Sequence, residues 1–325
     1  MNLNSKIYIA GHTGLVGSAL LRKLKSENYS NIVTQTHSEL DLTNQAIVEN
    51  FFQKEKPEYV ILAAAKVGGI YSNNNYPAEF IYSNLSIQTN VIHQAYLSNV
   101  KRLLFLGSSC IYPCESLQPI KEEYLLTGPL EATNRPYALA KIAGVEMCWS
   151  YNRQYGTNFL SVMPTNLYGE GDNYHPKNSH VIPGMIYKFH EAKIKKHSSV
   201  ILWGTGNPRR EFLYVDDMAE ATIFIMNLED QTYNSLLASE RNNGLPPSLN
   251  LGANSDISIN DLAYLIKDVV DFKGEIIFDS EKPDGTMRKL MDSSRLNKLG
   301  WNPKISLEDG LKKTYQNFKI SNRKS

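Results

Sequence analysis

A glycine-rich turn near the N-terminus, with a glycine at every third position of residues 11–17, constrains this chain more than any other feature. Residues 6–10 before it are apolar enough for a strand, and residues 18–26 after it carry leucines at helical spacing. A strand, a glycine turn and a helix in this order bring the N–H groups of a helix N-terminus to a pyrophosphate. The sequence therefore predicts a dinucleotide-binding turn formed by Gly11, Thr13, Gly14, Leu15, Val16 and Gly17.

Three later apolar runs, residues 58–65, 102–107 and 158–163, are typical of strands that are covered on both faces. Helical patterns with short connections alternate with these runs, and the longest spans residues 77–99. Such alternation predicts an α/β fold, a Rossmann-type doubly wound parallel sheet. Ligands bind to such sheets at the carboxyl ends of the strands.

The alternation loosens after residue 165, and residues 249–252 resemble a strand that returns to the sheet. We therefore predict a smaller α/β substrate domain that is interleaved with the first. The Rossmann domain takes residues 1–165 plus about 211–253, and the substrate domain takes residues 166–210 plus about 254–325.

Tyr137 and Lys141 lie four residues apart in a helical segment, so both side chains share one face. An ammonium beneath the phenol is expected to lower the tyrosine pKa from about 10 toward neutral pH, which suits proton transfer. Ser108, at the exit of the apolar run 102–107, is placed to hold a substrate oxygen against that phenol. A solvated helix face has the same spacing, so the order of the whole chain, not the pair alone, favours a site.

Composition narrows the class of protein. A formal net charge of +1 gives no electrostatic reason to expect a nucleic acid or an anionic membrane as partner. No apolar run approaches the roughly 18 residues of a membrane span. Three cysteines are too few for a disulfide framework, and no His or Cys cluster has zinc spacing, so we expect no metal and a cytoplasmic protein.

The sequence leaves the choice of cofactor open. An acidic residue at the end of the second strand, near residues 31–35, favours NAD, and an arginine there favours NADP. This chain has neither, because residues 34–37 read Thr-Gln-Thr-His and Thr13 stands in the glycine turn. Asp41 either accepts a hydrogen bond from the adenine amino group or caps the helix that follows.

Long runs of residues resemble the extended short-chain dehydrogenase/reductases that act on nucleotide sugars, and most of all the GDP-L-fucose synthase family. They are residues 63–70 (AAAKVGGI), 107–113 (GSSCIYP), 161–169 (SVMPTNLYG), 178–183 (NSHVIP) and 282–286 (KPDGT). The resemblance covers nearly the whole chain. It implies a GDP-4-keto-6-deoxy-sugar substrate, C3/C5 epimerisation and NADPH-dependent reduction at C4.

The resemblance also implies the catalytic roles. Cys110 matches the family's base and His180 its acid, because epimerisation beside a ketone needs one group on each face of the sugar. For Cys110, the alternative is a small buried hydrophobic residue. Tyr137 would protonate O4, Ser108 would orient it, and Lys141 would bind the nicotinamide ribose.

Two further sets of residues match the family's binding positions. The implied cofactor-binding residues beyond the glycine turn are Asp41, Ala64, Lys141, Pro164, Asn166, Leu167 and His180. The implied substrate-binding residues are Ser108, Ser109, Asn166, Val181, Lys188, Trp203, Arg210 and Lys282. Lys188 stands where the family commonly has arginine. Lysine keeps the positive charge but lacks the bidentate fork of a guanidinium group. NADPH is the cofactor implied, with NADH not excluded by the glycine turn.

Three hypotheses remain at this point. The first is a bifunctional GDP-4-keto-6-deoxy-hexose epimerase and reductase, and the second is a C4-reductase of a GDP-4-keto heptose with little or no epimerase activity. The third is a non-catalytic nucleotide sensor, which the joint presence of Ser108, Tyr137 and Lys141 disfavours. The resemblance also implies a homodimer through helices near residues 77–99 and 136–153.

Overall fold

A six-stranded parallel sheet forms the larger part of the protein, with strand order β2-β1-β3-β4-β5-β9. The computed structural model describes residues 1–176, 178–238, 244–282 and 284–322, so Pro283 of the run 282–286 lies outside the described residues. The strands are β1 Ile7–Ala10, β2 Ile32–Val33, β3 Tyr59–Leu62, β4 Arg102–Leu106, β5 Phe159–Pro164 and β9 Ser248–Leu251. The predicted Rossmann-type fold is confirmed.

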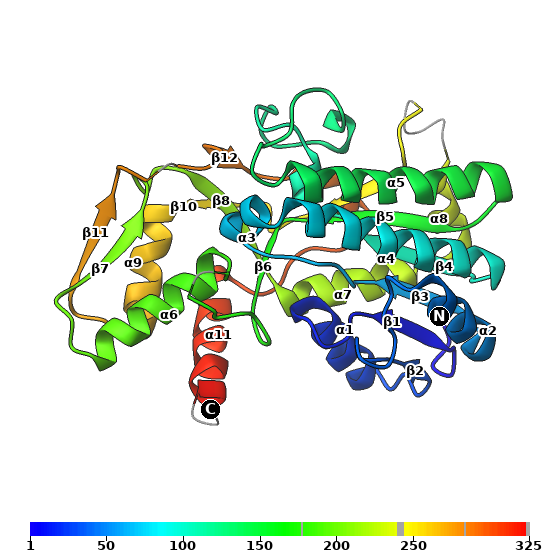
Figure 1. Cartoon of the computed structure of the whole chain (residues 1–325), viewed down its shortest axis with the longest axis horizontal. Coiled ribbons are helices and arrows are strands. Elements are labelled where there is room, and N and C mark those ends of the chain that lie inside the picture. The colour runs from blue at the N-terminus through cyan, green and yellow to red at the C-terminus, as the bar shows by residue number, and fades with distance from the viewer. Residues whose placement is uncertain (177, 239–243, 283, 323–325) are drawn as a thin grey trace.

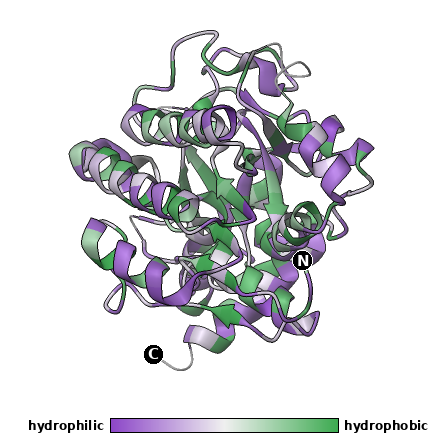
Figure 2. Cartoon of the chain, turned by 90° about the vertical axis from the view of Figure 1, so that its right-hand side faces the viewer, coloured by the Kyte–Doolittle hydropathy of each residue, from purple (hydrophilic) through white to green (hydrophobic). Residues whose placement is uncertain are grey.

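Helices cover both faces of this sheet, and each face has its own core (Figure 1). One core joins the sheet to α1 and α7, and the other joins it to α2, α4 and α5. Figure 2 shows the apolar strands between helices whose polar sides face outward. The helices of this part are α1 Leu15–Ser26, α2 Gln45–Glu55, α3 Ile70–Asn75, α4 Pro77–Leu97, α5 Arg135–Tyr155, α7 Val215–Met226, α8 Asp230–Leu237 and α10 Ser294–Lys298.

A smaller α/β part lies beyond the carboxyl ends of the large sheet, at the left of Figure 1. Strand β8 pairs with β6, β10 and β12, and a separate two-stranded ribbon joins β7 to β11. The strands are β6 Asn166–Tyr168, β7 Ser199–Trp203, β8 Arg209–Tyr214, β10 Asp256–Ser258, β11 Glu275–Asp279 and β12 Arg288–Lys289. Helices α6 Val181–Ile194, α9 Ile259–Val270 and α11 Leu307–Asn322 pack around them.

The chain enters the smaller part directly after β5, returns to the larger part with α7 and rejoins the large sheet at β9, which pairs with β5. The returning strand predicted over residues 249–252 is therefore confirmed, whereas the division of the chain at residues 165, 210 and 253 stays a prediction. Among the described residues, no helix is both long and apolar enough to cross a membrane. Helices α4 and α5, which carry the predicted dimer face, lie side by side (Figure 1).

Candidate active site

The glycine turn after β1 permits close backbone contacts that a side chain would prevent. Gly11 has φ +88°, and a Cβ atom there would lie 2.8 Å from the Cα atom of Ala64. A Cβ on Gly17 would collide with the carbonyl oxygen of Gly11. Helix α1 begins after Gly14 and has no acidic residue in its first turn. These features fit a pyrophosphate at the helix N-terminus, with Ala64 of the β3 loop beside the turn.

Asp41 does not cap the helix that follows it, so that alternative is wrong. The cap of α2 is Asn44, whose side chain accepts a hydrogen bond from the backbone N–H of Ile47. One oxygen of Asp41 accepts hydrogen bonds from the backbone N–H and hydroxyl of Thr43, which hold the pKa of Asp41 below its ordinary value. Its role toward adenine stays a prediction.

Lys141 is more completely buried beside Tyr137 than their spacing of four residues alone predicts. Its ammonium is 5.8 Å from the centre of the Tyr137 ring and donates a hydrogen bond to the Leu106 carbonyl oxygen at 2.7 Å. Only 3% of Lys141 is exposed, and burial lowers its pKa to about 7. An ammonium that easily loses its charge is a weak partner for a phenolate.

The expected lowering of the Tyr137 pKa is wrong for this structure. Burial and the negative charge available at Cys110 raise the Tyr137 pKa above its ordinary value, while a side-chain hydrogen bond with Ser108 lowers it. Burial wins because it disfavours the charged phenolate. Tyr137 therefore holds its proton at neutral pH, as a proton donor must.

The end of β4 brings Ser108 and Cys110 to the same place as Tyr137. A short 3-10 helix, Ser109–Ile111, follows the strand, and the Ser108 hydroxyl accepts a hydrogen bond from the Cys110 backbone N–H at 3.2 Å. Ser109 is buried, with 3% of its surface exposed. The predicted grouping of serine, cysteine and tyrosine at one strand end is thus present in the structure.

Two residues that sequence reasoning missed contact the Cys110 sulfur. The side-chain amide nitrogen of Asn134 lies 3.5 Å from it, and the Lys289 ammonium lies 3.6 Å from it. Lys289 reaches this place because β12 pairs with β8, which sets Lys289 opposite Arg210. Both residues line a small cavity of about 40 Å³ beside Cys110.

His180 immediately precedes α6, on a loop that packs against α3. The Ser72 hydroxyl donates to the side-chain oxygen of Asn178, and a Cβ on Gly69 would lie 2.8 Å from the Ser179 carbonyl oxygen. These contacts join the loop after β3 to the loop before α6. Although His180 is exposed, the protein around it lowers its pKa below the ordinary value.

The other predicted cofactor residues, Pro164, Asn166 and Leu167, lie at the junction of β5 and β6. Asn166 donates from its side chain to the Glu211 carbonyl oxygen at 2.8 Å, which ties this junction to β8. The predicted cofactor residues therefore lie where the chain passes from the large sheet into the smaller part.

Apart from Ser108 and Ser109 at the end of β4 and Asn166 on β6, the predicted substrate residues lie on four elements of the smaller part. Val181 and Lys188 are on α6, Trp203 on β7, Arg210 on β8 and Lys282 on an exposed turn after β11. The Lys188 ammonium donates to the Ile201 carbonyl oxygen at 3.2 Å, and burial lowers the Lys188 pKa. Trp203 is 64% exposed, so its ring is free for stacking.

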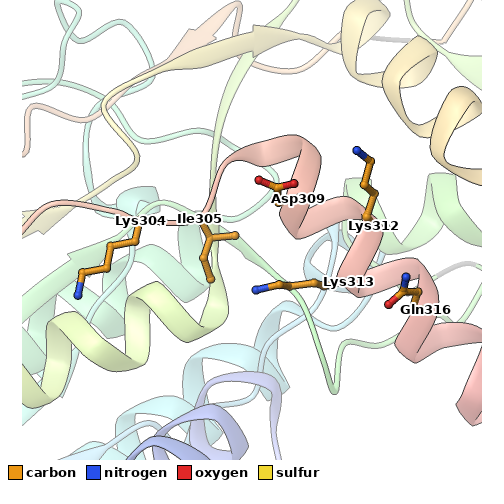
Figure 3. A pocket seen from close by; sticks show the side chains of 6 residues that line it. All are labelled: Lys304, Ile305, Asp309, Lys312, Lys313 and Gln316. Carbon is orange, nitrogen blue, oxygen red and sulfur yellow. The ribbon is translucent and has the colours of Figure 1, made fainter.

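A larger cavity of about 310 Å³ lies away from these residues, along α11 (Figure 3). Its lining includes three lysines, of which Lys304 pairs with Glu220 and Lys312 with Glu308. None of the predicted catalytic residues lines it, and its shape follows from charged side chains on a surface helix. Within the described ranges, no cluster of His, Cys, Asp or Glu has the geometry of a metal site.

The model of the NAD dependent epimerase/dehydratase family matches residues 7–235. The chain belongs to this family. Among its relatives, a putative GDP-L-fucose synthase 2 of Arabidopsis thaliana is 57% identical over 96% of this chain and 91% of its own. A GDP-L-fucose synthase of Escherichia coli (strain K12) is 51% identical over 96% of both chains.

This member of the epimerase/dehydratase family also resembles solved structures. A GDP-D-glycero-L-gluco-heptose synthase of Campylobacter jejuni, solved in the presence of NADPH, is 42% identical with a TM-score of 0.90. The match covers 98% of this chain and 99% of that one. Relatives of the hexose and of the heptose type are therefore both similar to this chain over nearly its whole length.

Proposed function

We propose that this protein reduces the C4 keto group of a GDP-4-keto-6-deoxy-hexose with NADPH, after it epimerises C3 and C5, as an enzyme of the GDP-L-fucose synthase type. One observation carries the proposal. A hydroxyl, a cysteine sulfur and a protonated phenol, from Ser108, Cys110 and Tyr137, gather at the end of β4. The identity to named GDP-L-fucose synthases over nearly the whole chain supports the GDP-sugar substrate.

Epimerisation comes first. The C4 keto group acidifies the protons on its neighbouring carbons, so a base on one face and an acid on the other can invert each centre. Cys110 takes a proton from carbon, and the negative charge moves to O4 as an enolate. His180 returns a proton to the opposite face. Ser108 donates its hydroxyl to O4 while the charge is there.

Reduction uses the same pocket. Bound NADPH supplies the hydride that C4 accepts. Tyr137 donates its proton to O4 as the alkoxide develops, which suits a phenol whose pKa is raised by burial. Lys141, tied to β4 through the Leu106 carbonyl oxygen, holds the nicotinamide ribose, and a proton from solvent replaces the one that Tyr137 gives up.

The smaller part binds the GDP portion in this proposal. Arg210 on β8 and Lys282 on the turn after β11 offer positive charge for a diphosphate. Trp203 and Val181, both exposed, offer apolar surface for the nucleoside. Lys188 adds a cation from α6.

A second candidate has specific support. The Campylobacter jejuni heptose synthase shares this chain's fold at a TM-score of 0.90, so a GDP-4-keto heptose is the alternative substrate. In that case reduction at C4 proceeds with little or no epimerisation. The stereochemistry of the product separates the two, since inversion at C5 converts a D-sugar into an L-sugar, whereas reduction at C4 alone does not.

We further infer a homodimer and a cytoplasmic location. Helices α4 and α5 carry exposed apolar side chains, Tyr82, Leu97, Leu139 and Tyr155, that a second copy would cover. A monomer in sedimentation experiments at micromolar concentration would contradict the dimer. Free cysteines and a need for NADPH suit a reducing compartment.

The test is product analysis. Purified protein is given GDP-4-keto-6-deoxy-D-mannose and NADPH, and the nucleotide sugar is examined by NMR. GDP-L-fucose is the expected product. A reduced 6-deoxy sugar of D configuration would favour the C4-reductase. No reduction of this sugar, and none of a GDP-4-keto heptose in a parallel reaction, would reject both.

A further inference from the structure

The Cys110 sulfur is offered two hydrogen-bond donors. One is the side-chain amide nitrogen of Asn134 at 3.5 Å, and the other is the ammonium of Lys289 at 3.6 Å. An ammonium and an amide nitrogen have protons to donate and no lone pair to accept one. The sulfur must therefore act as the acceptor toward both, and a thiolate accepts far better than a thiol.

Asn134 stands where an asparagine normally caps a helix, directly before α5. Its side chain makes no capping hydrogen bond, and its oxygen is buried without a partner among the described residues. The residue is held instead by Glu131, whose carboxylate accepts the Asn134 backbone N–H at 3.1 Å. Asn134 therefore occupies a capping position without capping the helix. Its side-chain oxygen has no partner among the described residues, and its amide nitrogen points to the Cys110 sulfur.

Lys289 carries a charge that no described carboxylate neutralises at ion-pair distance. Its neighbour Arg288 pairs with Asp256 at 2.6 Å, and Arg209 pairs with the same carboxylate at 2.8 Å. Arg210 is paired with Lys289 in the β8/β12 ladder. Negative charge at Cys110 raises the Arg210 pKa, in opposition to the larger lowering by burial. Among the described residues near the sulfur, the cations Lys289 and Arg210 stand against the Glu131 carboxylate that lines the same cavity, and this excess of positive charge favours the anionic form of the sulfur.

We propose that Lys289 and Asn134 are positioning residues that hold Cys110 as a thiolate ready to remove a proton from carbon. This rests on the proposed function, in which Cys110 is the base. As the S–H bond forms and the C–H bond breaks, the electron pair of the C–H bond moves into the enolate. Protonated His180 delivers a different proton to the other face. Cys110 then loses the captured proton to water, and His180 takes up a proton from water, so both groups regain their starting forms.

The test measures the thiolate directly in the free full-length protein. Iodoacetamide is applied across a range of pH, and mass spectrometry follows alkylation of Cys110 separately from Cys114 and Cys148. In Lys289→Met the midpoint of the Cys110 profile should move to higher pH by about one unit, which is about a tenfold slower reaction near neutral pH. Lys289→Arg should keep the midpoint. Arg288→Met, which removes the adjacent charge that pairs with Asp256, should also keep it.

Asn134→Asp separates this role from a structural one. Aspartate is a good helix cap, so the variant should be at least as stable as the wild type, yet its carboxylate faces the sulfur and should move the midpoint upward. A midpoint that is unchanged in both Lys289→Met and Asn134→Asp would overturn the proposal.

Deuterium exchange distinguishes failure here from failure of the proposed function. If wild-type protein incorporates deuterium into the keto sugar but the midpoints do not move, Cys110 needs no help from Lys289 and Asn134. If the midpoints move as expected but no deuterium enters the sugar, Lys289 and Asn134 do stabilise the thiolate, but Cys110 is not the base of an epimerase.

Discussion

The ammonium of Lys141 donates a hydrogen bond to the carbonyl oxygen of Leu106, the last residue of β4. This bond ties the first turns of α5 to the strand end that carries Ser108, so Tyr137, one turn earlier on α5, is fixed over that end. The same contact buries Lys141, and its charge becomes costly.

The burial of Lys141 predicts a pH-dependent stability. Its folded-state pKa is about 7, below its ordinary value, so between pH 7 and about 10 the unfolded chain binds a proton that the folded chain lacks. The free energy of unfolding of the wild type should therefore rise with pH relative to Lys141→Met, by at most about 1.4 kcal/mol per pH unit. Denaturant unfolding at pH 7, 8 and 9 measures the difference, and a difference independent of pH would contradict this account.

Replacement of Tyr137 by phenylalanine should separate the two reactions. Without its phenol the protein cannot protonate O4, and the reduction rate should fall by at least about a hundredfold. Exchange of the C3 and C5 protons should survive, because Cys110 and His180 are untouched. Assays of NADPH oxidation and of deuterium uptake test both halves, and loss of exchange together with reduction would refute the division of roles.

Glu211 joins the strand that carries Arg210 to two other segments. Its buried carboxylate accepts backbone N–H groups of Asn254 at 2.8 Å and Met291 at 3.0 Å, and burial raises its pKa to about 7. Glu211→Gln sets an amide N–H group against one of these donors and should lower the free energy of unfolding by about 1–3 kcal/mol.

Glu220→Gln is the matched control for that measurement. Glu220 lies closer to the surface and pairs with Lys304, so its loss should cost less than about 1 kcal/mol. Equal losses of unfolding free energy in the two variants would show that the buried contacts of Glu211 stabilise the protein no more than the ion pair of Glu220 does.

A single methyl group should disrupt the cofactor turn. In Gly17→Ala the new Cβ meets the Gly11 carbonyl oxygen, which must move from its place beside the helix N-terminus. Affinity for NADPH should fall by about tenfold or more, measured by quenching of protein fluorescence. Circular dichroism verifies that the variant is folded, and an unchanged dissociation constant in a folded variant would be evidence against this placement of the pyrophosphate.

The features that the sequence predicts well are local. The glycine turn, the buried strands and the Tyr137–Lys141 spacing each depend on residues close together in the chain, and the structure contains all of them. The sequence also predicts that these features meet at one edge of the sheet, because every β-to-α connection of a parallel sheet lies at the carboxyl ends of the strands.

The features that the sequence misses depend on long-range packing. Lys289 is 179 residues from Cys110 and lies on a strand of two residues, which has no periodicity to recognise. Asn134 looks like an ordinary helix cap until its side-chain direction is known. The depth of burial at Tyr137 and Lys141, which reverses the expected pKa shift of the phenol, cannot be obtained from a spacing of four residues.

Deuterium incorporation tests the central claim most directly. The protein is incubated with GDP-4-keto-6-deoxy-D-mannose in D₂O without reduced cofactor, and the sugar is examined by mass spectrometry and NMR, with Cys110→Ser as the control. Deuterium at C3 and C5 with the wild type, and little with Cys110→Ser, is the predicted result. No incorporation by a wild type that still reduces the keto sugar with NADPH would contradict the bifunctional account and leave a C4-reductase.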